Sequence, residues 1–205
     1  MGRSCRIAVL LGFALHGAVA SAWAQEPVAT LMCTSMPVNV QMPLPLQLAL
    51  DQLLVQSSTL RRQCAAIAAA STRAHLVIQV ARPDMASCRA RASFAWTSAG
   101  RLDVRIDVPF TRDFPELIAH ELEHVVEQIE GLNLRRLSEQ PASGVEEVAT
   151  GTFETARARD AGRRAALEVQ TQVRLVRAQE AFARASADAA ALALMPAPRA
   201  LATIR

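Results

Sequence analysis

Two histidines four residues apart are the most chemically informative feature of this 205-residue chain. They belong to the run His120-Glu121-Leu122-Glu123-His124, which has the pattern H-E-x-x-H. A step of four residues places both imidazoles on one face of an α-helix, about one turn apart, so their nitrogens can converge on one ion. Catalytic zinc takes three protein ligands and a water, and a nearby carboxylate can accept that water's proton. The run therefore predicts a single Zn²⁺ site with Glu121 as general base.

The motif lies in a pattern that resembles the zincin metallopeptidases. An alternating strand, the motif helix and a later helix with acidic residues follow one another over about half of the chain. The resemblance implies that His120 and His124 are ligands and that Glu121 is the general base. No Gly and third His follow at the metzincin spacing, so the chain looks like the gluzincin branch, whose third ligand is a downstream Glu. Residues 118–124 and 153–157 also resemble a group of small exported bacterial proteins of unassigned activity.

Several carboxylates compete for the position of third ligand. Glu154 stands in the capped first turn of the predicted final helix, and we prefer it. Glu146 and Glu147 are the alternatives, since they lie closer to the motif and look like the E-x-x-A piece of some gluzincins. Glu127 lies on the motif helix itself, but a full turn beyond the second histidine it reaches poorly toward an ion centred between the imidazoles.

The sequence also contains candidates for catalytic and supporting residues around the predicted ligands. Gluzincin peptidases usually offer a Tyr or His donor to the tetrahedral oxyanion, and this chain has no Tyr. His75 or Arg157 would have to serve, and Asp160 is a candidate to hold an imidazole N–H. The competing interpretations are that His75 is an ordinary half-buried strand residue and that Arg157 and Asp160 belong to the solvated face of an Arg-rich helix.

The amino-acid composition excludes several classes of function. Aromatic residues make up only 4% of the chain, which argues against a base-stacking nucleic-acid surface. All 22 basic residues are Arg, which excludes lysine-based chemistry. We therefore predict an exported zinc metallohydrolase, most consistent with a peptidase acting on a peptide or protein substrate. The alternatives are a non-catalytic exported protein whose metal joins two helices, and a metal-free protein whose histidines pack beside acids.

Strand and helix periodicities indicate the elements that must position this site. They predict helices over residues 46–70, 114–130, 134–137 and from about 152 to 190, and strands over residues 75–80, 90–97 and 102–108. The motif helix is the best delimited, with Asp113 as N-cap, Pro115 in the first turn and Gly131 at its end. The expected fold is α+β: one domain over residues 46–194, with a small antiparallel sheet packed on the motif helix.

The start of the chain is typical of a secretory signal peptide. Residues 1–24 contain Arg3 and Arg6, a short apolar run and an Ala-Trp-Ala site, so we expect cleavage after Ala24 and a periplasmic or secreted protein without a membrane anchor. Cleavage removes two Arg and no acid from a formal charge of +3, leaving +1. Residues 25–45 then read as an extended, Pro-rich leader, and residues 195–205 as a flexible tail.

Cysteine usage fits an exported protein. Cys33, Cys64 and Cys88 remain after cleavage and allow one disulfide and one free thiol. We favour a pair between Cys64 and Cys88, because both lie within the predicted domain. No C-x-x-C spacing occurs, which argues against a cysteine-only metal site.

Overall fold

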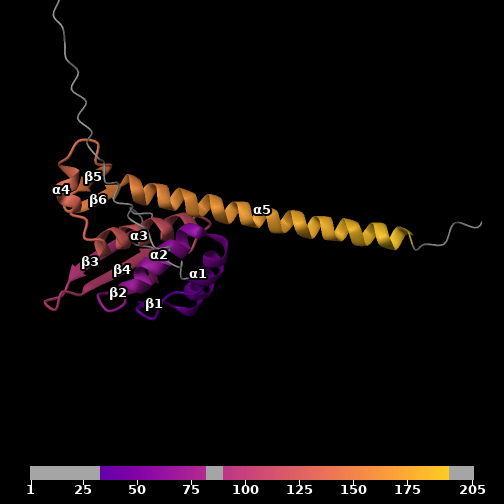
Figure 1. Ribbon diagram of the computed structural model, residues 1–205, viewed down its shortest axis with the longest axis horizontal. Coiled ribbons are helices and arrows are strands. Elements are labelled where there is room, and N and C mark those ends of the chain that lie inside the picture. The colour runs from indigo at the N-terminus through magenta and orange to yellow at the C-terminus, as the bar shows by residue number, and fades with distance from the viewer. Residues whose placement is uncertain (1–32, 82–89, 194–205) are drawn as a thin grey trace, which may run out of the picture. The chain divides into compact units, whose positions relative to one another are not determined.

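A computed structural model describes residues 33–81 and 90–193 (Figure 1). The predicted signal peptide, the tail over residues 195–205 and Cys88 lie outside these described residues. Within the described part, no helix is both long enough and apolar enough to cross a membrane.

A four-stranded sheet has the strand order β1-β2-β4-β3. Its strands are β1 (Val40–Gln41), β2 (Ala74–Val80), β3 (Arg91–Trp96) and β4 (Leu102–Val108). The α+β class is confirmed, but the sheet is mixed rather than antiparallel. β3 and β4 form the expected antiparallel hairpin, whereas β2 pairs in parallel with both β1 and β4. Alternation along a strand reports which side chains are buried, and it carries no information on the direction of the neighbouring strand.

Two helices, rather than one, follow β1. They are α1 (Leu44–Gln56) and α2 (Ser58–Ala69), so the single predicted helix over residues 46–70 was wrong. Ser57 between them adopts an extended backbone with φ of −126°, and its hydroxyl accepts a hydrogen bond from the Leu60 N–H. A serine that caps a new helix can do so only by leaving the old one, because the N-cap residue is not helical.

The predicted leader contributes to the domain from Cys33 onward. β1 lies within it, α1 begins at Leu44, and Cys33, Met36, Val40 and Met42 pack against the core. Leu46 and Leu50 of α1 pack with Leu76 and Ile78 of β2 in that core. The largest fully buried apolar side chains come from helices and strands alike: Leu46, Leu50, Leu54, Leu60, Ile67, Leu76, Ile78, Leu102, Ile106, Ile118 and Leu122.

The disulfide joins Cys33 to Cys64, with their Cα atoms 5.9 Å apart. The expected pairing of Cys64 with Cys88 was therefore wrong. That prediction assigned Cys33 to a leader outside the folded domain, whereas the chain around β1 returns against α2 and brings Cys33 within reach of Cys64.

The second half of the chain holds α3 (Phe114–Ile129), α4 (Leu134–Ser138), the hairpin of β5 (Val145–Ala149) and β6 (Thr152–Thr155), and α5 (Ala156–Ala193). The start of α3 and the position of α4 are as predicted. The final helix begins later than expected, because residues 152–155 pair with β5 as a strand. Gly151 turns the hairpin with a positive φ of 71°, a conformation that glycine adopts without strain.

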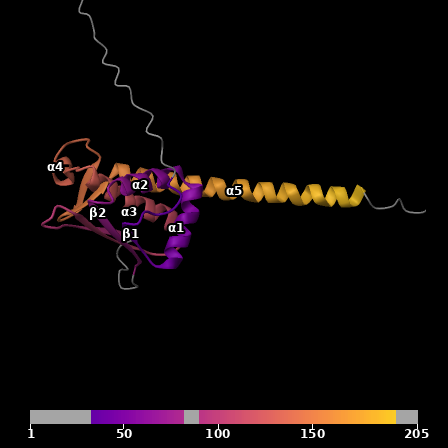
Figure 2. The same ribbon diagram turned by 60° about the horizontal axis from the view of Figure 1, so that its bottom comes forward.

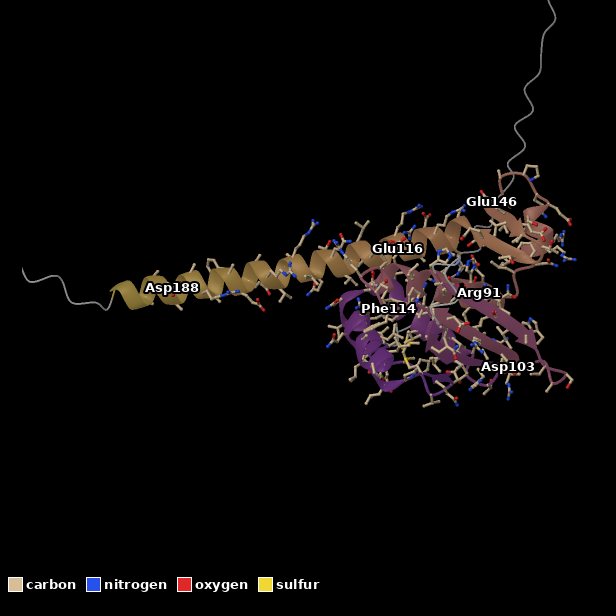
Figure 3. All side chains as sticks on the ribbon, turned by 180° about the vertical axis from the view of Figure 1, so that it is seen from behind. Arg91, Asp103, Phe114, Glu116, Glu146 and Asp188 are labelled. Carbon is tan, nitrogen blue, oxygen red and sulfur yellow. A yellow bond between two sulfur atoms is a disulfide. The ribbon has the colours of Figure 1, made fainter. Side chains whose placement is uncertain are left out.

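The first part of α5 lies along α3 (Figure 1 and Figure 2), and small side chains make this contact. Ala158, Ala161 and Ala165 are buried there, and Gly162 lies against the backbone of α3. A Cβ added at Gly162 would lie 2.9 Å from the carbonyl oxygen of Glu116 and 3.3 Å from the Cβ of His120. In contrast, every residue from 174 to 190 is exposed, including Asp188, which Figure 3 labels on the outer part of α5.

Candidate metal centre

The two motif histidines and Glu154 form a group that could hold a metal ion. One ligand atom from each of His120, His124 and Glu154 lies within 4.8 Å of the others. Glu154 Oε1 is 3.4 Å from His120 Nε2 and 3.8 Å from His124 Nε2. Ligands at 2.0–2.1 Å from a tetrahedral zinc ion are about 3.3 Å apart, so the spacing and the two-nitrogen, one-oxygen donor set both fit Zn²⁺.

The ligand atoms come from two elements that the fold brings together. α3 supplies both histidines from adjacent turns, with ring centroids 5.0 Å apart. β6 supplies Glu154, the preferred third ligand. Glu154 was expected in the first turn of the final helix, whereas it lies in the strand that precedes this helix and reaches the histidines from there. The side chains of His120 and Glu154 remain 20% and 27% exposed, so two of the three candidate ligands are accessible to solvent. A catalytic zinc site needs access for water and substrate.

The alternative third ligands point to other partners. Glu146, which is labelled in Figure 3, lies opposite Glu154 in the β5–β6 hairpin. Its carboxylate is exposed and pairs with Arg159 at 3.5 Å. Glu147 Oε1 accepts a hydrogen bond from the Gly151 N–H at 2.7 Å and stabilises the hairpin turn. The structure brings neither of them into the group formed by the histidines and Glu154.

Glu121, the predicted general base, is buried beside the two histidines. It is 6% exposed and accepts a hydrogen bond from the backbone N–H of Ala92 in β3. Burial raises the pKa of its carboxyl group, against the opposing effect of His120 and His124. A carboxylate with a raised pKa binds a proton more readily than an ordinary glutamate, which is the property required of a general base.

His120 and Glu154 shift each other's pKa in opposite directions. Burial lowers the pKa of His120, but the hydrogen bond to Glu154 and the negative charges of Glu154, Glu121 and Glu127 together outweigh it, and the net shift is upward. Burial raises the pKa of Glu154, but the hydrogen bonds from His120 and Thr155 and the charges of His120 and His124 together outweigh it, and the net shift is downward. Without a metal ion, the two side chains therefore favour an ion pair, in which a proton supplies the positive charge that a cation would otherwise bring.

Glu127 makes contacts that sequence analysis did not anticipate. Its Oε2 is 2.9 Å from His124 Nδ1, and its Oε1 accepts a hydrogen bond from the hydroxyl of Thr155 at 2.7 Å. Asp160, the predicted partner of an imidazole, instead pairs with Arg163 on the exposed face of α5, so that prediction was wrong. The i,i+3 spacing of Glu127 from His124 was the available signal, since residues three apart are neighbours on a helix.

Arg157 does not serve the ligand group either. Its guanidinium bonds Glu123 Oε1 at 2.5 Å and both carboxylate oxygens of Glu130, at 2.5 and 2.9 Å. Glu123 is also bonded by Arg62 and by Gln63. This network attaches α5 and α2 to α3, and the hydrogen bonds to Glu130 and Glu123 raise the pKa of Arg157. The predicted role at an oxyanion is therefore replaced by a structural one.

His75, the other predicted donor, lies away from the ligand group. It is half-buried on β2, beside a shallow hollow lined also by Asp103 and Arg105. Its neighbour Leu76 belongs to the core that contains α3, and successive strand residues face opposite sides of a sheet. His75 therefore faces away from α3, as the structural interpretation of this residue expected.

Comparison of the chain with protein-family models, curated proteins and solved structures finds no match.

Proposed function

We propose that this protein is an exported, zinc-dependent hydrolase that cleaves peptide bonds. The observation that carries the proposal is the convergence of His120, His124 and Glu154 on one point, with Glu121 buried beside it. When bound there, Zn²⁺ would lower the pKa of a coordinated water and polarise the substrate carbonyl. Glu121 would accept the proton of that water and pass it to the leaving amine.

The position of β3 supports a peptide as the substrate. β3 is an edge strand of the described sheet, and its Ala92 N–H already reaches Glu121, so the strand runs beside the proposed base. Phe94 and Trp96 lie on the same side of β3 as Ala92, and they are 36% and 58% exposed. An extended peptide can add to such an edge through main-chain hydrogen bonds and place apolar side chains against these rings.

Export is part of the same proposal. Residues 1–24 have the pattern of a cleavable signal peptide. The disulfide between Cys33 and Cys64 supports it, because disulfides persist in oxidising compartments such as the bacterial periplasm.

A non-catalytic metal site remains the second candidate. The ligand group connects α3 to the junction of β6 and α5, as a structural metal would. Arg157 and His75, the predicted donors to an oxyanion, have other positions, and the chain has no Tyr. The two candidates differ in one respect that can be measured, since only the enzyme requires Glu121 for turnover.

The test begins with protein purified from the periplasmic fraction, its first residue identified and its zinc content measured. We expect a chain starting at Gln25 with about one zinc per molecule. His120→Ala and Glu154→Gln should lose zinc, and Glu146→Gln, an exposed carboxylate on the same hairpin, should keep it. Peptide cleavage is followed with a mixture of internally quenched peptides.

Glu121→Gln decides between the two candidates. We expect it to retain zinc and to lose at least about 100-fold in kcat/KM, the typical contribution of a general base. A Glu121→Gln protein that cleaves peptides at the parent rate would remove Glu121 from the reaction. A parent that binds zinc and cleaves no peptide in the mixture would favour the structural site, and a parent without zinc would refute both.

A further inference from the structure

We propose that Glu127 and Thr155 are positioning residues that hold His124 and Glu154 in one fixed arrangement, an inference that rests on the metal site of the proposed function. Glu127 lies on α3 one turn beyond His124, and Thr155 follows Glu154 at the end of β6. The two side chains meet in the interior, where Glu127 is 1% and Thr155 2% exposed. They connect the second and third ligands by a path separate from the ligand atoms themselves.

The contact between Glu127 and His124 selects one form of the imidazole. Glu127 Oε2 is 2.9 Å from His124 Nδ1, and an ionised carboxylate can only accept a hydrogen bond from that nitrogen. A neutral His124 then carries its hydrogen on Nδ1 and leaves the lone pair on Nε2. It is Nε2 that faces Glu154 at 3.8 Å, on the side where the ligand atoms converge. Buried hydrogen bonding of this kind commonly orients histidine ligands of metals.

Thr155 connects this histidine to the third ligand. Its hydroxyl donates to Glu127 Oε1 at 2.7 Å and accepts a hydrogen bond from the Ala158 N–H at 2.9 Å. It therefore caps the first turn of α5 while it bonds α3. Glu154 is the adjacent residue, and the Thr155 N–H bonds its Oε1 at 2.9 Å. A displacement of β6 from α3 would break the Thr155 hydrogen bond and move Glu154 at the same time.

The chemistry requires a carboxylate at position 127. His124 and Thr155 both present hydrogens, so the residue between them must accept twice, with one oxygen for each. A glutamine has only one side-chain oxygen, and its amide group would face either His124 or Thr155 as a donor. Glu127→Gln therefore preserves the shape of the side chain and disrupts one of the two contacts.

The experiment measures zinc affinity by competition with a chromophoric chelator in the full exported protein. The variants are Glu127→Gln, Thr155→Val and the rescue Thr155→Ser, and the matched control is Glu130→Gln, a carboxylate directly after the end of α3 that bonds Arg157. We expect about a 10- to 100-fold weaker affinity for Glu127→Gln, the range seen when such outer partners are removed. Thr155→Val should also bind more weakly, whereas Thr155→Ser and Glu130→Gln should stay close to the parent.

Two spectroscopic readouts separate positioning from loss of folding. The ¹⁵N chemical shifts of the imidazoles in the metal-free protein should show His124 protonated on Nδ1 in the parent and a changed tautomer ratio in Glu127→Gln. The visible absorption bands of the cobalt-substituted protein should shift in Glu127→Gln and Thr155→Val and remain parent-like in Thr155→Ser. Because Thr155→Val keeps all three ligands, it tests the inference even if Glu127→Gln does not fold.

The outcomes distinguish this inference from the proposed function. If the parent binds zinc and both variants match its affinity and cobalt spectrum, the positioning role is wrong and the metal site stands. If the parent binds no zinc, the proposed function and the positioning role fail together. Weaker binding in Glu127→Gln and Thr155→Val, restored in Thr155→Ser, would support the connection between the two ligands.

Discussion

Glu121 and Glu123 show how neighbouring side chains on one helix acquire opposite chemistry. Burial raises the pKa of Glu121. Burial also acts on Glu123, but the hydrogen bonds from Arg62, Gln63 and Arg157 outweigh it and lower its pKa. A step of two residues on a helix turns a side chain to a different face, and here the two faces differ in whether cations surround the carboxylate. Glu121 is thus suited to exchange a proton and Glu123 to hold a charge.

Glu168 is a second carboxylate whose pKa is lowered by hydrogen bonds. It extends from α5 to the start of α2, where it bonds the Ser57 hydroxyl at 2.5 Å, the Ser58 hydroxyl at 2.6 Å and the Thr59 N–H at 3.1 Å. Burial raises the pKa of Glu168, but these hydrogen bonds outweigh it and the net shift is downward from 4.5. A negative charge at a helix N-terminus is also favoured by the helix dipole.

We expect Glu168→Gln to lower the free energy of unfolding by about 1–2 kcal/mol at neutral pH. Because the folded-state pKa is lowered, the contribution of the charge is complete above the unfolded value of 4.5 and disappears as the pH falls through the folded value. Urea unfolding of parent and variant at neutral and acidic pH measures the difference. Glu180→Gln, on the exposed part of α5, is the control, and a difference that persists undiminished in acid would contradict the assignment.

At the scale of elements, the α3–α5 contact determines where the candidate metal centre forms. Gly162 lies against α3, where an added Cβ would meet the carbonyl oxygen of Glu116 and the Cβ of the candidate ligand His120. Gly162 was not among the residues predicted to matter, although a glycine inside a helix is a signal of close packing, since it costs about 1 kcal/mol relative to alanine.

Gly162→Ala should therefore destabilise the protein, by about 1–3 kcal/mol, because the added Cβ would contact the backbone of α3. At a helical position without a neighbour, the same change would stabilise by about 0.5–1 kcal/mol, so the sign of the effect is diagnostic. Zinc affinity should fall in the same variant, since α5 continues directly from the strand that carries Glu154. Thermal unfolding and chelator competition measure the two effects, and a gain in stability would refute the close contact.

At the scale of the whole molecule, the disulfide attaches the segment before β1 to α2. Cys33 and Cys64 are 31 residues apart, and closing a loop of that length contributes about 3–4 kcal/mol through the entropy of the unfolded chain. We expect Cys33→Ser and Cys64→Ser to lose this amount in denaturant unfolding and Cys88→Ser to lose little. Equal losses in Cys64→Ser and Cys88→Ser, with none in Cys33→Ser, would restore the pairing that the sequence favoured.

The features that depend on local spacing were predictable from the sequence. The step from His120 to His124, the start of the motif helix after Asp113 and the alternation over residues 102–108 are all local patterns, and α3 and β4 formed where they predicted. Glu154 was likewise preferred over Glu146 and Glu147 before the structure placed it beside the histidines. Glu154 was chosen for its position at the start of the predicted final helix. The β-hairpin that brings it to the site was not predicted.

The partner of each strand, cysteine and carboxylate depends on long-range packing and could not be predicted from local patterns. The parallel pairing of β2 with β4, the disulfide from Cys33, and the contact of Glu127 with Thr155 join residues that are distant in sequence. A local pattern records whether a side chain is polar or apolar and which way it faces, but several carboxylates can satisfy the same donor. Which one does so depends on the packing of α3 against α5 and the hairpin, because that packing determines the distances.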